Sequence, residues 1–395
     1  MKIAIVFGTR PEVIKLAPII YALKNHFKLT TVFSGQHTSL INNALSFFDI
    51  TPDYTFSCMN KKPDLGTLTA RINREMSAVF KKEKPKAVIV QGDTMTTYTA
   101  AFQGFLSKMP VVHVEAGLRT NNKFSPYPEE VLRTLVSRIA DFHFAPTAGA
   151  RENLLSEKIR RDRILITGNT VVDALLLAER MLDEKEIFSE LSKALSMDAG
   201  EGFRKKKTVL VTSHRRENIS FGLKQICSAV NTLSDRYKNL LFIWPLHKNP
   251  DVRKIVFREI NKRRENILIT EALSYPATVY LMRKSVIIMT DSGGIQEEAP
   301  TFRRPVLVLR ESTERPEIIE SGTGFLTGTD DKKICRVFSK LYEDRDFYKR
   351  ATRVKNPFGD GKASERILKF FLNRDVQDFI SRYPASFDME FRGFK

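Results

Sequence analysis

Short apolar runs rich in β-branched residues alternate with longer amphipathic stretches along almost the whole chain. This alternation is typical of βαβ units, in which the strands of a parallel sheet are joined by helices that pack on the sheet. The sequence therefore predicts an α/β protein. The expected strands form two series, Ile3–Phe7, Leu29–Phe33, Ala87–Val90, Val111–Val114, Phe142–Ala145 and Ile164–Thr167, and then Val209–Thr212, Leu241–Trp244, Ile267–Thr270, Val286–Thr290 and Val306–Leu309.

The two series of strands indicate two domains, which 395 residues suffice to build at roughly 100–200 residues per domain. A polar stretch from Asp198 to Lys207 separates them, preceded by two amphipathic helices from about Val171. We expect two doubly wound, Rossmann-like domains, residues 1–170 and 171–364, facing each other across a cleft. The clearest helical patterns are Pro18–Lys24, Thr67–Phe80, Thr97–Leu106 and a last segment from Ala363 to about Ser381.

Composition excludes several classes of protein. With 42% apolar and 28% charged residues, the chain is an ordinary globular protein. Cys58, Cys227 and Cys335 lie far apart, which excludes a disulfide scaffold and a structural zinc site. Met1-Lys2 leads directly into an apolar strand, and no apolar run reaches the ~20 residues of a membrane span. We expect a cytoplasmic protein that has no membrane partner.

The net charge of +18 raises the question of a nucleic-acid partner. Basic runs such as Arg160-Arg161, Arg204–Lys207 and Lys262–Arg264 are scattered and lack the interleaved aromatic residues that stack on bases. The distribution therefore favours a solvated basic surface without nucleic acid, which also attracts small anionic substrates.

Basic residues follow the first expected strand. In doubly wound sheets ligands bind at the carboxyl ends of the strands, so Arg10 and Lys15 are placed to bind a phosphate. The alternative is an ordinary surface pair near a helix start. The segment Gly8–Glu12 contains no G-x-G-x-x-G pattern, so we expect no nicotinamide or flavin cofactor.

Three carboxylates occupy comparable places in the first domain. Asp93, Glu115 and Glu129 each follow an apolar strand or begin a helix. Asp93 alone could be a helix cap, but three carboxylates at one sheet end favour acid/base chemistry. They do not resemble an all-oxygen cage, and we expect no metal.

The second domain offers anion-binding residues. His214 and Arg215 directly follow a strand, and His247 has a similar but weaker setting. The turn Ser292-Gly293-Gly294 ends another strand and begins a helix, so its free backbone N–H groups can receive a diphosphate. Glu298, about one turn further, could bind the hydroxyls of a ribose. An ordinary helix-start turn is the alternative.

These segments, in collinear order, closely resemble the non-hydrolysing UDP-N-acetylglucosamine 2-epimerase family. The matching motifs are GTRPE (8–12) with Lys15, QGDT (91–94), HVEAGLRT (113–120), SPYPEE (125–130), GNTVVDAL (168–175), HRRE (214–217), LHKNP (246–250), TDSGGIQEEAP (290–300), TERPE (313–317) and NPFGDGKAS (356–364).

The resemblance implies a glycosyltransferase-B-like fold whose C-terminal helix, residues 365–395, returns to the first domain, and a homodimer. It implies interconversion of UDP-GlcNAc and UDP-ManNAc by anti elimination of UDP, through a 2-acetamidoglucal, and re-addition, which supplies ManNAc for cell-surface polysaccharide. It implies that the catalytic residues are Lys15, Asp93, Glu115, Glu129 and His214, and that the substrate-binding residues are Arg10, Arg133, Arg215, Ser292, Gly293, Gly294, Glu298 and Arg315.

Bacterial members of that family are commonly activated by UDP-GlcNAc bound beside the substrate. By position, Gln36, Arg71 and His247 correspond to that second nucleotide site, and Asn43 stands where a Gln is usual. A second departure is Leu132 ahead of Arg133, where the family often has Asn.

Four other functions stay open at this point. An epimerase of a UDP-2,3-diacetamido uronic acid shares the His-Arg and Asp-Ser-Gly-Gly segments, although it typically lacks the SPYPEE and TERPE forms. A glycosyltransferase of the same fold, a non-catalytic UDP-sugar-binding paralogue and an RNA-binding offshoot are the others, because fold alone does not decide function.

Overall fold

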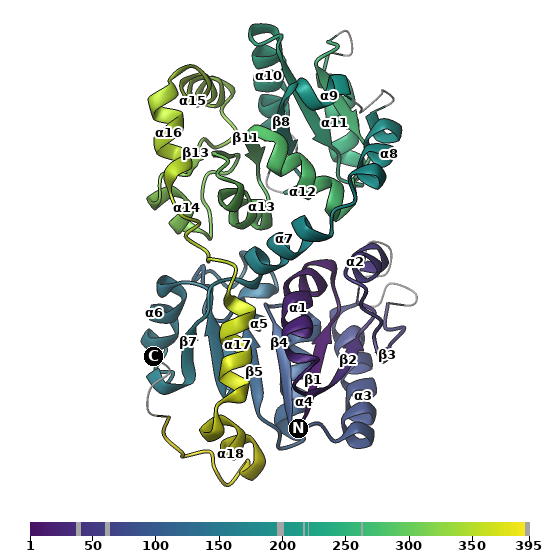
Figure 1. Ribbon diagram of the computed structural model, residues 1–395, viewed down its shortest axis with the longest axis vertical. Coiled ribbons are helices and arrows are strands. Elements are labelled where there is room, and N and C mark those ends of the chain that lie inside the picture. The colour runs from purple at the N-terminus through teal and green to yellow at the C-terminus, as the bar shows by residue number, and fades with distance from the viewer. Residues whose placement is uncertain are drawn as a thin grey trace. The chain divides into compact units, whose positions relative to one another are not determined.

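The computed structural model describes residues 1–36, 41–59, 64–195, 201–215, 218–219, 221–261 and 264–391. The chain forms two compact units (Figure 1). Unit 1 consists of Met1–Leu177 and Phe358–Lys395, and unit 2 of Ala178–Pro357.

Unit 1 is built on a seven-stranded parallel sheet of order β3-β2-β1-β4-β5-β6-β7. The order reverses at β1, so the carboxyl ends of β1 and β4 border the place where doubly wound sheets bind ligands. The strands are β1 Lys2–Phe7, β2 Lys28–Phe33, β3 Tyr54–Thr55, β4 Ala87–Gln91, β5 Val111–Val114, β6 Phe142–Ala145 and β7 Ile164–Ile166.

Helices cover both faces of this sheet. Helices α3, α4 and α5 pack side by side, whereas the C-terminal α17 packs against α1 (Figure 1). The helices are α1 Arg10–Leu23, α2 Ile41–Phe47, α3 Leu65–Glu83, α4 Met95–Leu106, α5 Glu129–Ile139, α6 Ala148–Ser156, η1 Arg161–Arg163, α7 Thr170–Met181, which crosses into unit 2, α17 Ala363–Leu372 and α18 Arg374–Arg382.

Unit 2 repeats the plan with a six-stranded parallel sheet of order β10-β9-β8-β11-β12-β13. The strands are β8 Lys207–Thr212, β9 Leu240–Pro245, β10 Ile267–Thr270, β11 Ser285–Thr290, β12 Val306–Val308 and β13 Gly324–Leu326. The helices are α8 Glu184–Leu195, α9 Glu201–Lys205, α10 Phe221–Arg236, α11 Pro250–Glu259, α12 Tyr275–Lys284, α13 Gly293–Glu298, η3 Ala299–Phe302, α14 Pro316–Glu320, α15 Asp331–Glu343 and α16 Arg345–Arg353.

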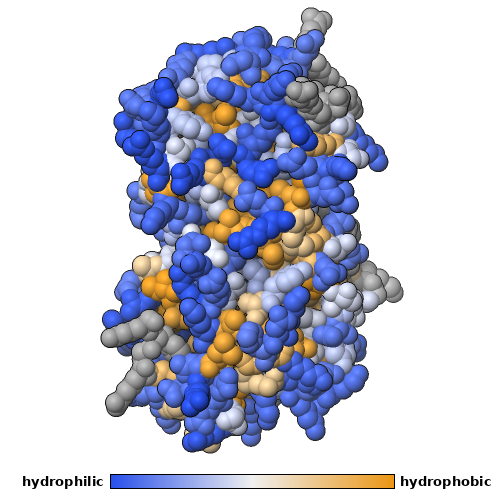
Figure 2. Space-filling view, in the orientation of Figure 1, coloured by the Kyte–Doolittle hydropathy of each residue, from blue (hydrophilic) through white to orange (hydrophobic). Residues whose placement is uncertain are grey.

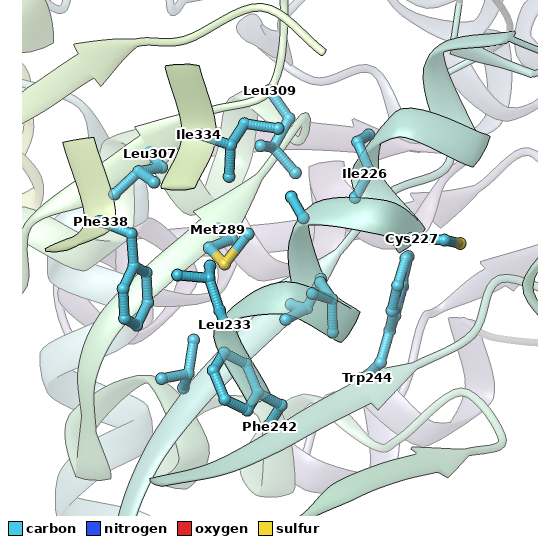
Figure 3. Packing of buried hydrophobic residues seen from close by; sticks show 14 of the residues in the cluster. Ile226, Cys227, Leu233, Phe242, Trp244, Met289, Leu307, Leu309, Ile334 and Phe338 are labelled. Carbon is cyan, nitrogen blue, oxygen red and sulfur yellow. The ribbon is translucent and has the colours of Figure 1, made fainter. Parts of the chain in front are cut away.

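The core of unit 2 lies between its sheet and helices α10 and α15. Figure 3 shows Trp244 and Phe242 of β9, Met289 of β11, Ile226 of α10 and Phe338 of α15 meeting there. These side chains are almost completely buried, and each contributes roughly 1.5–3 kcal/mol of burial free energy. This packing fixes the strand ends that carry the nucleotide-binding candidates.

The fold class and all eleven expected strands are confirmed, apart from differences of one or two residues at the ends. Strands β3 and β13, which have two and three residues and lie at the edges of their sheets, were not predicted. Neither contains a run of β-branched apolar residues, which made the equally short edge strand β7, Ile164–Ile166, recognisable.

Two helix predictions need correction. Helix α1 begins at Arg10 and runs through Pro18, where the prediction began it, because Thr9 and Glu12 form a capping box at the start. The expected helix Ala363–Ser381 is two helices, because the side chain of Asn373 accepts hydrogen bonds from the backbone N–H groups of Asp375 and Val376 and begins α18.

The expected domain boundaries also need correction. Residues 171–177 and 358–364, which the prediction gave to the second domain, belong to unit 1. Val171, Val172 and Leu175 are buried there. Asp173 of α7 accepts hydrogen bonds from the backbone N–H groups of Ala363 and Ser364, at 3.1 and 2.8 Å, which ties the two chain segments together.

Blue, hydrophilic residues dominate the face drawn in Figure 2, in line with the high content of charged residues. Orange patches interrupt them. Within the described residues, no helix is long and apolar enough to cross a membrane.

Candidate active site

The first candidate residues lie in the loop between β1 and α1 and in the first turn of α1. Glu12 is buried, and its Oε2 accepts hydrogen bonds from the backbone N–H groups of Gly8 and Thr9, at 3.0 and 2.7 Å. Its Oε1 accepts from the hydroxyl of Thr94 at 2.7 Å. Burial raises the pKa of Glu12, although these hydrogen bonds work against the shift. Glu12 therefore joins the loop after β1 to the loop after β4, which carries Asp93.

Gly8 is the position in this turn that tolerates no side chain. A Cβ atom there would lie 2.1 Å from Oγ1 of Thr96 and 2.3 Å from Oγ of Ser34. These two hydroxyls bond to each other at 2.6 Å. The glycine thus lets the turn between β1 and α1 approach Thr96 in the first turn of α4 and Ser34 just after β2. Arg10, the first residue of α1, is partly exposed beside it.

Lys15 of α1 and Glu115, just beyond β5, form an ion pair of 2.5 Å between Nζ and Oε2. Their side chains are only 10% and 7% exposed. The amide of Gln91, at the end of β4, donates to the same Oε2 at 2.8 Å. The carboxylate of Glu115 is thereby held at the sheet end by donors from two neighbouring elements.

Asp93 has its own cation. Arg133 of α5 forms an ion pair with Oδ2 of Asp93 and lies 3.4 Å from Oε2 of Glu130. The side chain of Arg133 is almost buried, so its guanidinium is shared by two carboxylates in a fixed place. This ties the start of α5 to the end of β4.

Glu129, the first residue of α5, differs from the other two carboxylates. Its Oε2 is buried, and within the described part of the chain it has no hydrogen-bond partner. Asp93 and Glu115 are therefore each paired with a cation. The Oε2 atom of Glu129 has no such partner among the described residues.

In unit 2, Asp291 follows β11 and is completely buried. It accepts hydrogen bonds from Oγ of Ser213 at 2.8 Å, from the backbone N–H groups of His214 and Arg215 at 2.9 and 3.0 Å, and from the amide of Asn218 at 3.0 Å. Burial works to raise the pKa of Asp291, but the donors, His214 first, outweigh it and hold the pKa below its ordinary value. Asp291 thus joins the ends of β8 and β11.

His214 stands on this carboxylate. Its Nδ1 lies 3.2 Å from Oδ1 of Asp291, and its side chain is 37% exposed. The ring of His247 stacks on it, with centroids 5.5 Å apart. Nε of Arg215 is buried without a hydrogen-bond partner among the described residues, and Arg216 and Glu217 lie outside them.

The Ser-Gly-Gly turn begins α13, as predicted, with Ser292 as the N-cap. Gly293 has a second reason to lack a side chain, because a Cβ atom there would lie 2.6 Å from Cζ of Arg315. At Gly294 a Cβ atom would meet only Oγ of Ser292, at 4.0 Å. Gly293 thus leaves room for the guanidinium of Arg315 against the backbone of the turn.

Arg315 lies between two carboxylates, those of the buried Glu297 and the partly exposed Glu314. Its Nε donates to Glu297 at 2.7 Å and its Nη1 to Glu314 at 3.1 Å. Arg310 also donates to Glu314, at 2.9 Å. Burial works to raise the pKa of Glu314, but Arg310 and Arg315 outweigh it and lower the pKa to about 2.

Glu298 is the last residue of α13 and is buried. The hydroxyl of Tyr275, the first residue of α12, donates to its Oε1 at 3.0 Å. A carboxylate held in this way can accept hydrogen bonds from a pair of vicinal hydroxyls on a ligand.

The residues expected at a second nucleotide site are found on both units. Gln36 accepts from the hydroxyl of Thr96 at 2.7 Å, and Arg71 donates to the carbonyl of Cys58 at 3.1 Å. Asn43 is exposed on α2. The ring of His247 stacks on that of another predicted site residue, His214.

Glu12 and Asp291 are functional candidates that were not predicted from the sequence. The Thr9-x-x-Glu12 spacing is a readable capping-box signal for the first. For Asp291, the only signal in the sequence was its position at the end of a strand and before a glycine turn. Among the described residues, no group of three or more His, Cys, Asp or Glu side chains could hold a metal ion.

Comparison with known proteins places these segments in one family. The family model described as UDP-N-acetylglucosamine 2-epimerase matches residues 21–372. The UDP-N-acetylglucosamine 2-epimerase of Yersinia pestis is 42% identical over 380 residues, which cover 95% of this chain and 100% of that protein. That of Escherichia coli K12 is 40% identical over 379 residues, 95% of this chain and 100% of its own.

Solved structures agree. The crystal structure of the Neisseria meningitidis UDP-GlcNAc 2-epimerase bound to UDP-GlcNAc is similar, with a TM-score of 0.86, 41% identity and coverage of 94% of this chain and 100% of that one. The Methanocaldococcus jannaschii UDP-GlcNAc 2-epimerase in complex with UDP-GlcNAc and UDP gives a TM-score of 0.78 at 33% identity, over 94% and 99% of the two chains.

Proposed function

Because the chain belongs to the UDP-N-acetylglucosamine 2-epimerase family, we propose that it inverts the configuration at C2 of UDP-GlcNAc and forms UDP-ManNAc reversibly. The sugar is assigned to the carboxylates of unit 1 and the UDP group to unit 2. The observation that carries this proposal is the pair of carboxylates Asp93 and Glu115, which follow neighbouring strands and are each held by a cation.

The proposed reaction is an elimination followed by an addition. A base removes the proton from C2 while the bond from C1 to the phosphate oxygen breaks, which gives a 2-acetamidoglucal and UDP. A proton then returns to the opposite face of C2 and UDP re-adds at C1. Two faces of one carbon require more than one acid/base group, and unit 1 supplies Asp93, Glu115 and Glu129.

The cations of unit 1 suit this chemistry. Lys15 and Arg133 hold Glu115 and Asp93 in one orientation, so little reorganisation accompanies proton transfer. Lys15 is also placed to exchange a proton with Glu115, because their atoms are within hydrogen-bond distance. Arg10 is assigned to the diphosphate.

The UDP group is assigned to the strand ends of unit 2. His214, Arg215 and Arg315 supply cationic or donor groups for the departing diphosphate, together with the backbone N–H groups of the turn 292–294. The carboxylate of Glu298, oriented by Tyr275, is assigned to the ribose hydroxyls.

The test is a proton NMR time course with UDP-GlcNAc in D2O. We expect UDP-ManNAc to appear with deuterium at C2, because the proton removed there exchanges with solvent before one returns. Asp93→Asn, Glu115→Gln and Glu129→Gln should each slow this exchange by roughly 10²-fold or more. Glu152→Gln, an exposed carboxylate on α6, is the matched control and should leave the rate unchanged.

Two other outcomes would contradict these assignments. If UDP binds but neither deuterium nor the epimer appears, the assignment of the sugar is wrong, and a UDP-2,3-diacetamido uronic acid is the next substrate to offer. If UDP itself does not bind, the assignment of unit 2 is wrong as well.

Four further features belong to this proposal. We propose that a second nucleotide binds this protein, with His247 as its candidate contact on unit 2 and Gln36, Asn43 and Arg71 as the candidates on unit 1. We propose a homodimer in which a second copy covers the exposed Phe105, Leu106 and Leu135 of α4 and α5. The free thiols fit a cytoplasmic enzyme, whose product supplies cell-surface polysaccharide.

A further inference from the structure

We propose that Asp291 is a positioning residue that holds the His214 imidazole as the Nδ1–H tautomer and leaves Nε2 as the ring nitrogen that exchanges a proton with the ligand. The inference rests on the proposed function only for the identity of that ligand, the diphosphate of a UDP-sugar. It assigns Asp291 a role through His214 rather than through contact with the substrate.

The first argument is the contrast in burial between the two side chains. Asp291 is 0% exposed, whereas the side chain of His214 is 37% exposed and lies 3.2 Å away through Nδ1. The buried carboxylate of Asp291 thus contacts the imidazole of His214 from the protein interior, while the ring is partly exposed to solvent. A carboxylate in this place fixes both the orientation and the tautomer of an imidazole.

The carboxylate of Asp291 is surrounded by hydrogen-bond donors. Oδ2 accepts from the backbone N–H groups of His214 and Arg215, and from the amide of Asn218. These three groups can only donate, and the hydroxyl of Ser213 lies 2.8 Å from the same oxygen. Burial works to raise the pKa of Asp291, but the surrounding donors hold it below its ordinary value, so the carboxylate is ionised. Oδ1 faces the same backbone N–H of His214 at 3.1 Å. Because an ionised carboxylate can only accept hydrogen bonds, Nδ1, which lies 3.2 Å from Oδ1, has to be the donor between these two atoms.

The third argument is that the ring and its partner are fixed from several sides. The amide of Asn218 also donates to the carbonyl of Leu309 at 3.0 Å, so the carboxylate is anchored to the ends of β8, β11 and β12 together. The ring of His247 stacks on His214 at an interplanar angle of 24°. A carboxylate held this firmly sets the position of the imidazole rather than following it.

The test is the tautomer of His214, measured by long-range ¹H–¹⁵N correlation on protein labelled in its histidines, with and without UDP. The chain has 6 histidines, and the spectrum of His214→Gln assigns the signal. We expect the wild-type ring to show a protonated Nδ1. A wild-type ring protonated only at Nε2 would overturn the proposal, and this measurement needs no variant of Asp291.

The diagnostic variant is Asp291→Asn. Its amide nitrogen would face Nδ1 as a donor, which forces the proton of the ring onto Nε2. We expect the tautomer to switch and kcat to fall by roughly 100-fold. If the ring stays protonated at Nδ1 in this variant, Asp291 does not set the tautomer.

The matched control is Ser213→Ala, which removes a 2.8 Å hydrogen bond to Oδ2 but leaves Oδ1 facing the ring. A merely structural role of Asp291 predicts similar effects of both variants, whereas our proposal predicts that Ser213→Ala keeps the wild-type tautomer. A protein with a protonated Nδ1 that does not epimerise UDP-GlcNAc would refute the proposed function and leave the Asp291–His214 relation intact.

Discussion

Lys15 and Glu115 are 100 residues apart in the chain, yet Nζ and Oε2 lie 2.5 Å from each other. Glu115 adopts a left-handed backbone conformation with φ of +62°, which costs a residue other than glycine about 1–3 kcal/mol. The ion pair and the hydrogen bond from Gln91 hold the carboxylate in this conformation. Such strain is typical of positions where the direction of a side chain matters more than local stability.

The first prediction concerns this ion pair. Lys15→Met leaves a nearly buried carboxylate with only part of its partners, and we expect the free energy of unfolding to fall by about 3 kcal/mol. The double variant Lys15→Met/Glu115→Gln should recover part of that loss, because no charge is left unpaired. Urea unfolding measures both. Epimerisation activity should not recover in the double variant. If the single and double variants unfold with the same free energy, Lys15 and Glu115 are not coupled.

The second prediction concerns Glu12. Glu12→Ala leaves the backbone N–H groups of Gly8 and Thr9 without their acceptor, and we expect a loss of about 3 kcal/mol in the free energy of unfolding. Glu12→Gln keeps one acceptor oxygen and should lose less. Because Thr94 adjoins Asp93, kcat should fall in both variants while the affinity for UDP stays the same. A loss of UDP affinity as large as the loss of kcat would speak against this role.

The third prediction separates two reasons for the glycines of the Ser-Gly-Gly turn. Gly293→Ala places a methyl group 2.6 Å from Cζ of Arg315, so the guanidinium has to leave Glu297. We expect the dissociation constant for UDP, measured by calorimetry, to rise about tenfold, which is about 1.4 kcal/mol. Gly294→Ala is the matched comparison, because its methyl group meets only Oγ of Ser292 at 4.0 Å. An equal loss in both variants would instead mean that the diphosphate itself needs the space.

The fourth prediction concerns acid stability. Burial lowers the pKa of His113 to about 3 and that of His143 to about 4, both from 6.5. Between pH 6.5 and these values the unfolded chain binds protons that the folded chain does not, so stability falls as the pH falls. At pH 5 each histidine should cost about 2 kcal/mol relative to neutral pH.

The check is urea unfolding of the wild type and of His113→Gln at pH 7, 6 and 5. Glutamine offers a side-chain N–H in place of the one that His113 directs at the carbonyl of Gly92, at 2.7 Å, but does not titrate. We expect the variant to lose less stability on acidification than the wild type. Parallel pH profiles of the two proteins would contradict the prediction.

Much of the fold could be predicted because its signals are local. Each long strand is a run of β-branched residues and each long helix an amphipathic period, and both can be read within a few residues of the chain. The two edge strands β3 and β13 escaped because neither contains a run of β-branched apolar residues, unlike the equally short β7 and β12. The first turns of α1 escaped because Pro18 was read as a helix start, although the Thr9-x-x-Glu12 capping box marks the true start and outweighs the hydrogen bond lost at the proline.

The sequence by itself determined which residues stand at the strand ends, because a doubly wound sheet brings every strand's carboxyl end to one edge. Only the tertiary structure decided which of them meet. Lys15 with Glu115, Arg133 with Asp93, and His214 with Asp291 join positions 100, 40 and 77 residues apart. The roles of Glu12 and Asp291, and the space that Gly293 leaves for Arg315, depend in the same way on strand order and helix packing. Which ion pairs form depends on the distance between the charged groups and on their burial in the folded protein. The spacing of two residues along the chain predicts neither the distance nor the burial.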